Sequence, residues 1–309
     1  MKIVSKKKAF AIIIALVSTC KIASAQDVDL FKSLDEQDKK DKQNQTDYTT
    51  AIFKTTRMIN GQSIENVGAG VLDVKISHRF TPINAGAKGL WGLDGANMRM
   101  GVDYGINRWA MVGIGRTKGG LFDGFAKVKL LRQSTGKVKM PVSVSLSGGA
   151  IWSTDKASTY NNYSDRFNYS LQAIVARKFN DYISLQVVPT VIHYNSVEKS
   201  SIPNDFYSIG FGGRLRLTKR VNLTAEYYYR LTNPSDYTYG GSKPVNCLSV
   251  GFDIETGGHV FQFHFSNSPD MNDRSFINET TQKWNVDAVR FGFNIARVFV
   301  INAPKAVKI

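Results

Sequence analysis

The segment YSIGFGGRLRLT, residues 207–218, decides the fold. Large apolar side chains alternate along it with polar residues and glycines. Successive side chains of an extended strand point to opposite faces, so the alternation separates the two sets. One face carries Tyr207, Ile209, Phe211, Leu215 and Leu217, and the other carries Ser208, Gly210, Gly212, Arg214, Arg216 and Thr218. This period of two predicts a β-strand with one apolar and one polar face, and it does not suit a helix of a soluble protein.

The same alternation recurs from Gly70 almost to the C-terminus. It predicts about twelve strands, many of about ten residues, which is the length that a tilted strand needs to cross a bilayer. An even number also suits a closed barrel with both chain ends on one side. The predicted strands are 70–80, 97–106, 108–117, 123–132, 141–154, 166–178, 182–194, 206–218, 221–230, 245–256, 259–268 and 286–301.

The expected fold class is all-β: a transmembrane, up-and-down antiparallel β-barrel. A bilayer offers the backbone no hydrogen-bond partners, so a spanning sheet must close and remove its edges. The rival is a soluble β-sandwich, in which a single core would have to bury all of these aromatic faces. Aromatic residues near the strand ends favour the barrel, because barrels place them at both membrane interfaces. They are Tyr104, Trp109, Trp152, Tyr182, Tyr207 and Tyr229.

The connections between the predicted strands are a second test of this topology. Outer-membrane barrels have short periplasmic turns and longer external loops. The expected external loops are long at 81–96, 155–165, 195–205, 231–244 and 269–285, and the expected periplasmic turns are tight at Asn107, 179–181, 219–220 and 257–258. Two connections fit less well, since 118–122 is a short external loop and 133–140 is a longer periplasmic one.

The N-terminus predicts export. Lysines precede an apolar run of nine residues, 9–17, and the triplet Ala23-Ser24-Ala25 follows. This order predicts a secretory signal peptide over residues 1–25, with Gln26 as the mature N-terminus. A membrane-anchor helix would need about 20 apolar residues. Lipoprotein processing at Cys20 is a second alternative, although Thr19 is unfavourable just before a lipidated cysteine.

Two segments separate the signal peptide from the first strand. Residues 26–47 are rich in Asp, Lys and Gln and bury little apolar surface, so we expect a disordered, flexible periplasmic leader. Residues 48–69 are more apolar but lack sustained alternation, and we expect an arm or a plug that enters the barrel of residues 70–301. Removing the five lysines of residues 1–25 lowers the formal charge from +15 to +10. Only Cys247 then remains, so the fold has no internal disulfide.

The chain resembles DUF5777, a family of Bacteroidetes outer-membrane β-barrels of unknown function. The resemblance rests on TTRMINGQSIENVGAGVLDVKISHRF (55–80), LWGLDGANMRMGVDYGINRWAMVGIGR (90–116), DGFAKVKLLRQSTG (123–136), MPVSVSL (140–146), ARKFNDYISLQVVPTVIH (176–193), GGRLRLTKRVNLTAEYYY (212–229), GFDIETGGHVFQFHFSNS (251–268) and FGFNIARVFV (291–300). It implies a barrel in the outer membrane and implies no substrate. Nothing is carried over to the leader or to the loops 155–165 and 231–244.

The polar faces of the strands supply the candidate site. We expect them to line the lumen with Arg99, Asp103, Lys127, Lys129, Arg214, Arg216, Glu226, Arg230, Asp253, Glu255, His264 and Arg290. Basic groups outnumber acidic ones in this set, so an open pore would favour anions. The alternative is that the charged groups pair across a narrow lumen and fill it, as happens in small barrels.

Catalytic and metal sites are weakly indicated. The four histidines show no recurrent metal spacing, and the five-residue step from His259 to His264 puts these two on opposite strand faces. A membrane hydrolase would need a histidine near a serine, for which His264, Ser266 and either Asn267 or Asp253 are the candidates. Serine and asparagine are ordinary barrel residues, so we expect no enzyme, no metal and no cofactor.

Three functions remain open. The first is a pore or transporter for a small anionic solute. The second is a closed barrel with a structural or surface-binding role, and the third is a lipid-modifying membrane enzyme. The expected partners are outer-membrane lipid and a small solute. Nucleic acid is not expected as a partner of an exported protein, and the sequence indicates no protein partner.

Overall fold

The computed structural model describes residues 45–154, 162–285 and 287–302. The predicted signal peptide and nearly all of the predicted leader lie outside these residues. No helix among the described residues is long and apolar enough to cross a membrane.

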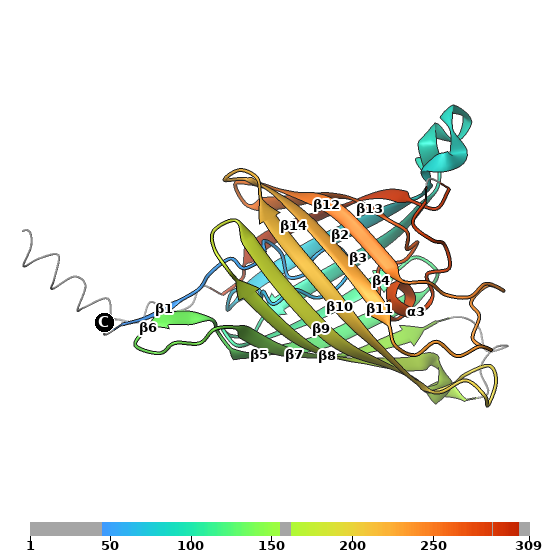
Figure 1. Cartoon of the computed structure of the whole chain (residues 1–309), viewed down its shortest axis with the longest axis horizontal. Coiled ribbons are helices and arrows are strands. Elements are labelled where there is room, and N and C mark those ends of the chain that lie inside the picture. Colours follow the sequence, from blue (N-terminus) through green and yellow to red (C-terminus); the bar gives the residue numbers. More distant parts are fainter. Residues whose placement is uncertain (1–44, 155–161, 286, 303–309) are drawn as a thin grey trace, which may run out of the picture. The chain divides into compact units, whose positions relative to one another are not determined.

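Twelve antiparallel strands form a closed barrel (Figure 1), which confirms the predicted fold class. Each strand pairs with the next one along the chain, and β14 pairs with β2 to close the sheet. The strands are β2 (Val71–Pro82), β3 (Ala96–Gly105), β4 (Ala110–Thr117), β5 (Leu121–Leu131), β7 (Ser143–Ser153), β8 (Phe167–Lys178), β9 (Ile183–Tyr194), β10 (Asp205–Arg216), β11 (Val221–Arg230), β12 (Cys247–Thr256), β13 (His259–Ser266) and β14 (Arg290–Val300).

Strand ends differ from the sequence prediction where the chain turns early. The strand predicted over 206–218 ends at Arg216, because Leu217 and Thr218 both donate their N–H groups to Val221 O in the turn. The strand predicted over 286–301 begins at Arg290.

Within β9, the pairing with β8 is interrupted beside Pro189, since proline has no N–H to donate to the ladder.

The two ends of the barrel are unlike. At the turn end lie the connections 106–109, 179–182, 217–220 and 257–258, together with the longer connection 132–142. Both ends of the barrel chain meet there, where Asn302 N donates to Gly70 O at 3.0 Å. The loop end carries 83–95, 118–120, 195–204 and 231–246, together with the described residues 154, 162–166, 267–285 and 287–289 of the other two connections. This arrangement matches the predicted alternation of turns and loops, including its two exceptions.

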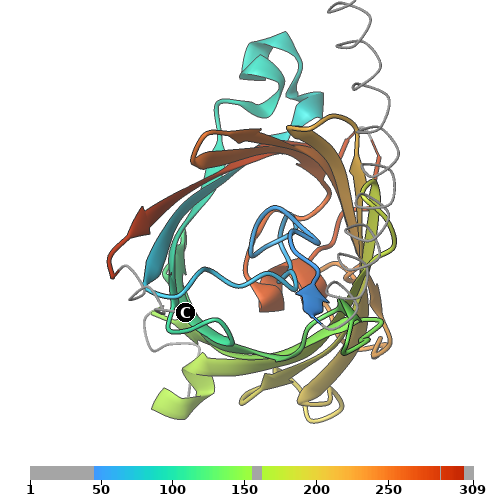
Figure 2. The ribbon, with the colours of Figure 1, turned by 90° about the vertical axis from the view of Figure 1, so that its left-hand side faces the viewer.

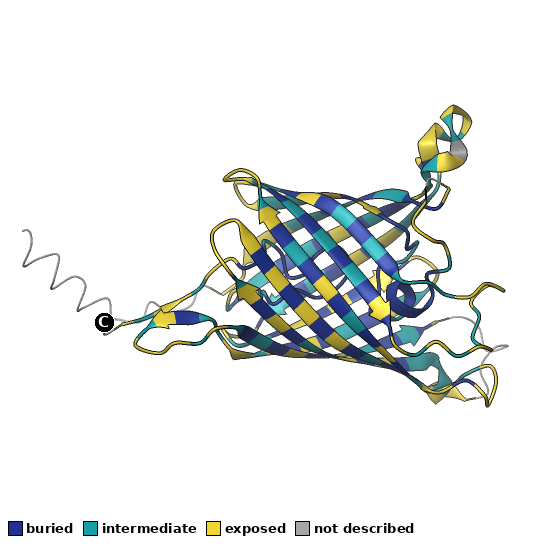
Figure 3. Ribbon diagram, viewed as in Figure 1, coloured by how far each residue is buried: buried dark blue, intermediate teal, exposed yellow. Residues whose placement is uncertain are grey.

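Burial alternates residue by residue along the strands (Figure 3). On β10, Phe211 is 46% exposed on the outer face whereas Arg214 is 4% exposed on the inner face. The outer face is apolar and the inner face is mostly polar, which is the reverse of a soluble barrel and suits lipid outside. Stacked aromatic pairs such as Phe80 with Phe291, whose ring centroids are 5.9 Å apart, lie on the outer face.

Smaller elements complete the fold. Strands β1 (Thr46–Tyr48) and β6 (Ser134–Gly136) form a separate two-stranded antiparallel sheet, so β1 includes the last residues of the predicted leader. Among the described residues, four short helices lie in the loops: η1 (Ile83–Ala85), η2 (Ala87–Gly92), η4 (Tyr163–Arg166) and α3 (Asp273–Asn278).

Candidate functional site

The interior of the barrel is occupied by the chain itself. Residues 49–69, which we call the plug, enter from the turn end and lie within the ring of strands (Figure 2). The plug folds back as a hairpin, in which Ser63 N donates to Thr56 O at 2.9 Å and Met58 N donates to Gly61 O at 2.8 Å. Most of its side chains are buried. The segment 48–69 was expected to be an arm or a plug, and the structure places 49–69 in the lumen.

Glu226 on β11 holds the tip of the plug. Its carboxylate accepts hydrogen bonds from the backbone N–H groups of Ile59 at 3.3 Å, Asn60 at 2.9 Å and Gly61 at 3.1 Å. The Asn60 side chain donates to the same carboxylate at 2.6 Å. Successive N–H groups of a tight turn form an anion-binding concavity, and here a barrel-wall carboxylate is the anion. The tip is therefore bound through its backbone as well as through a side chain.

The Asn60 side chain extends this attachment to two other parts of the wall. Asn60 Nδ2 donates to Ser249 Oγ at 3.0 Å, and Asn60 Oδ1 accepts from Arg79 Nη2 at 2.8 Å. The same guanidinium donates to Ser268 O at 2.8 Å and lies 2.9 Å from His264 Nε2. One plug residue is thus connected to β2, β11 and β12, and through Arg79 to the start of the β13–β14 loop.

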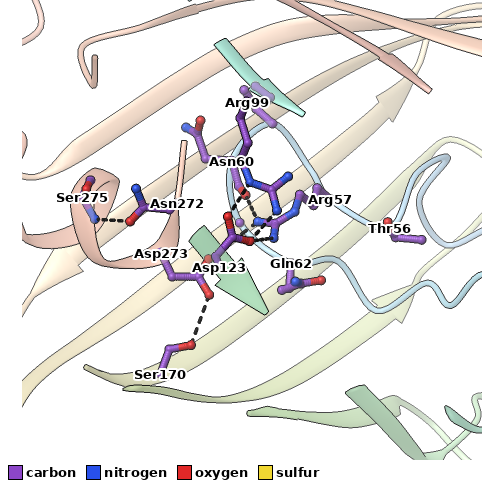
Figure 4. A network of polar contacts seen from close by, with 12 residues as sticks. Thr56, Arg57, Asn60, Gln62, Arg99, Asp123, Ser170, Asn272, Asp273 and Ser275 are labelled. Atoms are coloured by element: carbon purple, nitrogen blue, oxygen red, sulfur yellow. Dashed lines mark hydrogen bonds and ion pairs between the residues drawn. The ribbon is translucent and has the colours of Figure 1, made fainter. Parts of the chain in front are cut away.

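A charged network joins the plug, the wall and helix α3 (Figure 4). Arg57 of the plug lies 3.7 Å from carboxylate oxygens of both Asp123 and Asp273. Asp123 also accepts two hydrogen bonds from Arg99, of which the Nε–Oδ1 bond is 2.9 Å long. Ser170 Oγ donates to Asp273 at 3.3 Å. Because Asp123 lies on β5 and Asp273 on α3, Arg57 connects the plug to both.

Lysines hold the base of the hairpin. Lys127 Nζ donates to the carbonyl oxygens of Ser63 at 2.9 Å and Glu65 at 2.7 Å. Lys75 pairs with Asp103, which also accepts a hydrogen bond from Thr56 Oγ1 at 2.9 Å. Backbone carbonyls of the plug that would otherwise be buried without a donor are thereby satisfied by ammonium groups.

The opposite side of the plug is apolar. Ile52, Phe53, Met58 and Ile64 form a buried cluster with Ile174, Ala176 and Val188 of the inner wall. These wall residues lie on β8 and β9, away from the charged residues of β2–β5 and β11. The inner wall is therefore matched to the plug, with apolar residues facing its apolar side and charges facing its polar side.

A second segment closes the lumen from the loop end. In the loop 267–289, helix α3 is capped by Asn272, whose side chain accepts from Ser275 N at 3.0 Å. Phe276 and Ile277 pack inside the barrel in a buried cluster with Ile192, Tyr194, Phe206, Tyr228 and Cys247. Figure 2 shows α3 within the ring of strands. Burial raises the pKa of the Asp270 and Asp273 carboxyls above their usual range.

The structure places the sequence-predicted lumen residues in two groups. The fully buried group is Arg99, Asp103, Lys127, Arg214, Glu226, Arg230, Asp253 and His264, and the half-buried group is Lys129, Arg216, Glu255 and Arg290. Several bind the plug, as when Arg214 Nη1 donates to Ala51 O at 2.9 Å and Lys54 pairs with Glu255 at 2.6 Å. Others do not, since Arg230 donates to Pro244 O at the loop end and Asp253 accepts from Thr224 and Gln262 on the wall.

The prediction from sequence omitted four inward charges that the network uses. They are Asp73, Lys75, Arg79 and Asp123. The signal was available, because Asp73, Lys75, Ser77 and Arg79 alternate with Leu72, Val74, Ile76, His78 and Phe80 in the sequence. Asp123 was harder to recognise, since the next inward residue on β5 is the apolar Phe125.

His264 and Ser266, the candidate residues for a hydrolase site, make their contacts with other groups. Ser266 Oγ accepts from Ser249 Oγ at 2.9 Å and from Ser268 N at 3.1 Å. His264 Nε2 instead faces Arg79. Within the described ranges, no group of three or more His, Cys, Asp or Glu residues could hold a metal ion.

Two cavities flank the stem of the plug near the turn end. One of about 400 Å³ lies between the plug and the wall at Asp73, Glu255 and His259. The other, of about 240 Å³, is lined by Arg108, Lys129 and Arg132. Glu65 and the stem residues 66–68 contact both cavities.

One family model matches most of the described chain. Residues 53–299 match the DUF5777 family model, which is described as a membrane bound beta barrel domain. Similar solved structures include the NanC porin, with 8% identity, a TM-score of 0.47 and coverage of 75% of this chain and 100% of that one. The KdgM porin has 8% identity, a TM-score of 0.45 and coverage of 74% and 99%. Acinetobacter baumannii outer membrane protein Omp33 has 10% identity, a TM-score of 0.38 and coverage of 74% and 97%. No curated protein matches the sequence.

Proposed function

The chain belongs to the DUF5777 family of membrane-bound β-barrel domains, and we propose on this premise that it is a gated outer-membrane conduit for a small anionic solute. The plug occupies the conduit in the closed state, and solute passes when the plug is displaced. The observation that carries the proposal is the attachment of the plug tip to Glu226 through three backbone N–H groups. These bonds hold the tip of the plug noncovalently, whereas the C-terminal end of the plug continues through Gly70 into β2.

The chemistry of the inner wall supports a plug that leaves. The wall residues that hold it are mostly charged or polar, and water hydrates such groups when a partner departs. A permanently sealed lumen would not require these charges, since a buried ion pair is often no better than a hydrophobic replacement of similar volume. The side chains of the inner wall are therefore suited to contact with water when the plug is displaced.

The charge of the wall supports anion preference. Without the plug, basic side chains would outnumber acidic ones on the inner face, and a narrow low-dielectric channel focuses such an excess. The basic residues are Lys75, Arg79, Arg99, Lys127, Lys129, Arg214, Arg216, Arg230 and Arg290, and the acidic ones are Asp73, Asp103, Asp123, Glu226, Asp253 and Glu255.

The rival function is a closed barrel with a structural or surface-binding role. The observation that favours it is the depth of the filling, because the plug and α3 close the lumen from opposite ends and meet through Arg57 and Asp273. A lipid-modifying enzyme is the third candidate, and Ser266 and His264 give it no paired nucleophile and base. We propose no catalytic role and no nucleic-acid partner.

Single-channel recording separates the first two functions. The mature chain and a variant lacking residues 51–67 are refolded, checked for heat-modifiable migration on a gel, and inserted into planar bilayers. We expect the complete chain to be mostly closed and the shortened chain to give steady steps with a reversal potential that favours anions. Because α3 also closes the lumen, the deciding barrel lacks both residues 51–67 and α3 (Asp273–Asn278). If this barrel folds and conducts nothing, the closed-barrel function is supported and the gated conduit is overturned.

A further inference from the structure

An apolar groove lies on the lipid-facing surface of the barrel near the loop end. Its volume of about 460 Å³ lies within the range of about 300–1,000 Å³ that ligand pockets occupy. Strands β2, β3, β4, β5 and β7 form it, and the wall separates its outer face from Lys75 and Asp123, whose side chains point into the lumen and bind the plug. Its outward-facing lining residues are Val74, Met100, Val102, Ile114, Arg116, Phe122, Gly124, Ala150 and Trp152.

Small residues create the depth of the groove. Its floor includes the backbone at Gly101 and Gly115, and Gly124 and Ala150 present almost no side chain to the lipid. Gly124 does not need to be glycine for packing reasons, because a Cβ there would find its nearest neighbours 3.8 and 3.9 Å away. The large side chains of Met100, Ile114 and Trp152 stand around this hollow.

A cation and an indole lie at one end of the groove. Arg116 is exposed on the outer face one residue before the end of β4, so it lies towards the loop end of the wall. Its guanidinium is 5.6 Å from the Phe122 ring centroid, and Phe122 is 5.6 Å from Trp152. The Trp152 N–H is buried and has no hydrogen-bond acceptor among the described residues. A charge on a lipid-facing surface is costly unless an anionic group at the membrane interface compensates it.

We propose that this groove binds one acyl chain of an anionic, phosphate-bearing lipid, with the phosphate on Arg116. The apolar hollow accepts the chain, and the ring of Trp152 lies beside the Arg116–Phe122 pair at the headgroup end. The site requires only that the barrel spans a membrane, so it stands whether or not the lumen conducts.

A second outer groove provides the comparison. It has a volume of about 340 Å³ and is lined by Leu146, Leu171, Ala173, Pro189, Thr190, Val191, Tyr207, Ser208, Ile209 and Leu231. No lysine or arginine lines it. Any bilayer lipid can therefore fill the second groove, whereas the first should select by headgroup charge.

Trp152 serves as the reporter of occupancy. Trp91, Trp109 and Trp284 are replaced by phenylalanine, and the full chain is refolded in mixed bilayers in which either phosphatidylglycerol or phosphatidylcholine carries brominated acyl chains. We expect the anionic lipid to quench Trp152 with about fivefold higher relative affinity, since one basic residue near the surface attracts anionic lipid by about 1 kcal/mol. Equal quenching by the two lipids would overturn the proposal.

Paired substitutions test the two halves of the site. Arg116→Gln should abolish the preference for the anionic lipid. Arg177 is a lipid-facing arginine near the turn end, and Arg177→Gln should leave the preference unchanged.

The apolar hollow is tested separately. Ala150→Leu fills the groove and should lower quenching of Trp152 by both lipids, whereas Ala173→Leu fills the uncharged groove and should not. A preference that survives Arg116→Gln, or quenching that survives Ala150→Leu in a correctly folded barrel, would contradict the site. If Ala150→Leu does not fold, Gly124→Ala provides the same test with a smaller side chain.

Discussion

At the scale of single residues, Gly61 determines how closely the plug can approach the wall. A Cβ at this position would overlap with Tyr228 Oη, so the backbone of the plug tip lies directly against a wall tyrosine. This close approach brings three successive N–H groups within reach of Glu226. The small residue at the tip therefore allows the wall carboxylate to bind the backbone of the plug.

Gly61→Ala should loosen the plug tip. Overpacking in a well-packed interior costs about 1–3 kcal/mol, so tryptic cleavage after Arg57 should become about tenfold faster or more in the folded barrel. Gly68→Ala is the matched control, because a Cβ there lies 3.4 Å from Val71 Cγ2, which is an ordinary contact. Equal cleavage rates in the two variants would show that the tip is not seated against Tyr228.

At the scale of elements, the plug and α3 form one closure from two sides. Arg57 contacts Asp273 directly, and Arg79 reaches both Asn60 of the plug and Ser268 at the base of the α3 loop. Displacement of either segment removes one charged partner of the other, although Arg57 would keep Asp123 and Asp273 would keep Ser170. The two segments should therefore open together more often than independently.

The α3 loop should be held more firmly in acid. Burial, followed by the nearby Glu279 carboxylate, raises the pKa of Asp270 above its usual value. A group whose pKa is raised in the docked state favours docking below its undocked pKa, and this contribution is lost as the pH rises through the docked pKa. In the variant lacking residues 51–67, lowering the pH from about 7 to 4 should therefore reduce the conductance. Asp270→Asn should weaken this dependence, and an opposite pH dependence would contradict the inward-folded loop.

The sequence predicted the strands much better than the two closing segments. Alternation identifies β10 and β11 because each strand residue faces either lipid or lumen, and the two environments demand opposite chemistry. The plug has no such period, since its surroundings change from Ile174 on one side to Glu226 on the other. Helix α3 has only six residues, and nothing local distinguishes it within the predicted loop 269–285. The pairing of Arg57 with Asp123 and Asp273 joins distant segments and is not visible in one sequence.

At the scale of the whole molecule, the barrel reverses the usual arrangement of a folded protein. Most side chains on its outer face are apolar and most of the charged side chains on its strands face inwards, so the bilayer stabilises the outside while the chain itself fills the inside. Closure of the sheet by β14 and β2 leaves no strand edge unpaired in the barrel. The polar interior depends on the plug for its hydrogen bonds, whereas the sheet depends on the bilayer.

Because lipid contacts one face of β10 and the plug contacts the other, substitutions on the two faces should affect folding unequally. Phe211→Asp puts a carboxylate against lipid and should destabilise the barrel by up to about 2 kcal/mol, lowering the yield of the folded, heat-modifiable form. Arg214→Ala removes a hydrogen bond to Ala51 O of the plug and should leave barrel assembly intact. The free energy of unfolding is measured by urea titration in bilayers, and the yield of the folded form by its heat-modifiable migration. Similar values for both variants would refute the face assignment.

Hydrogen–deuterium exchange of the plug tip in the refolded, membrane-inserted chain tests the central claim most directly. If the plug is docked in the lumen, the amides of Ile59, Asn60 and Gly61 should exchange orders of magnitude more slowly than unstructured chain, and Glu226→Ala should remove this protection while the strands stay protected. Exchange of these three amides at the rate of an unstructured peptide in the unsubstituted barrel would contradict a lumen closed by its own plug.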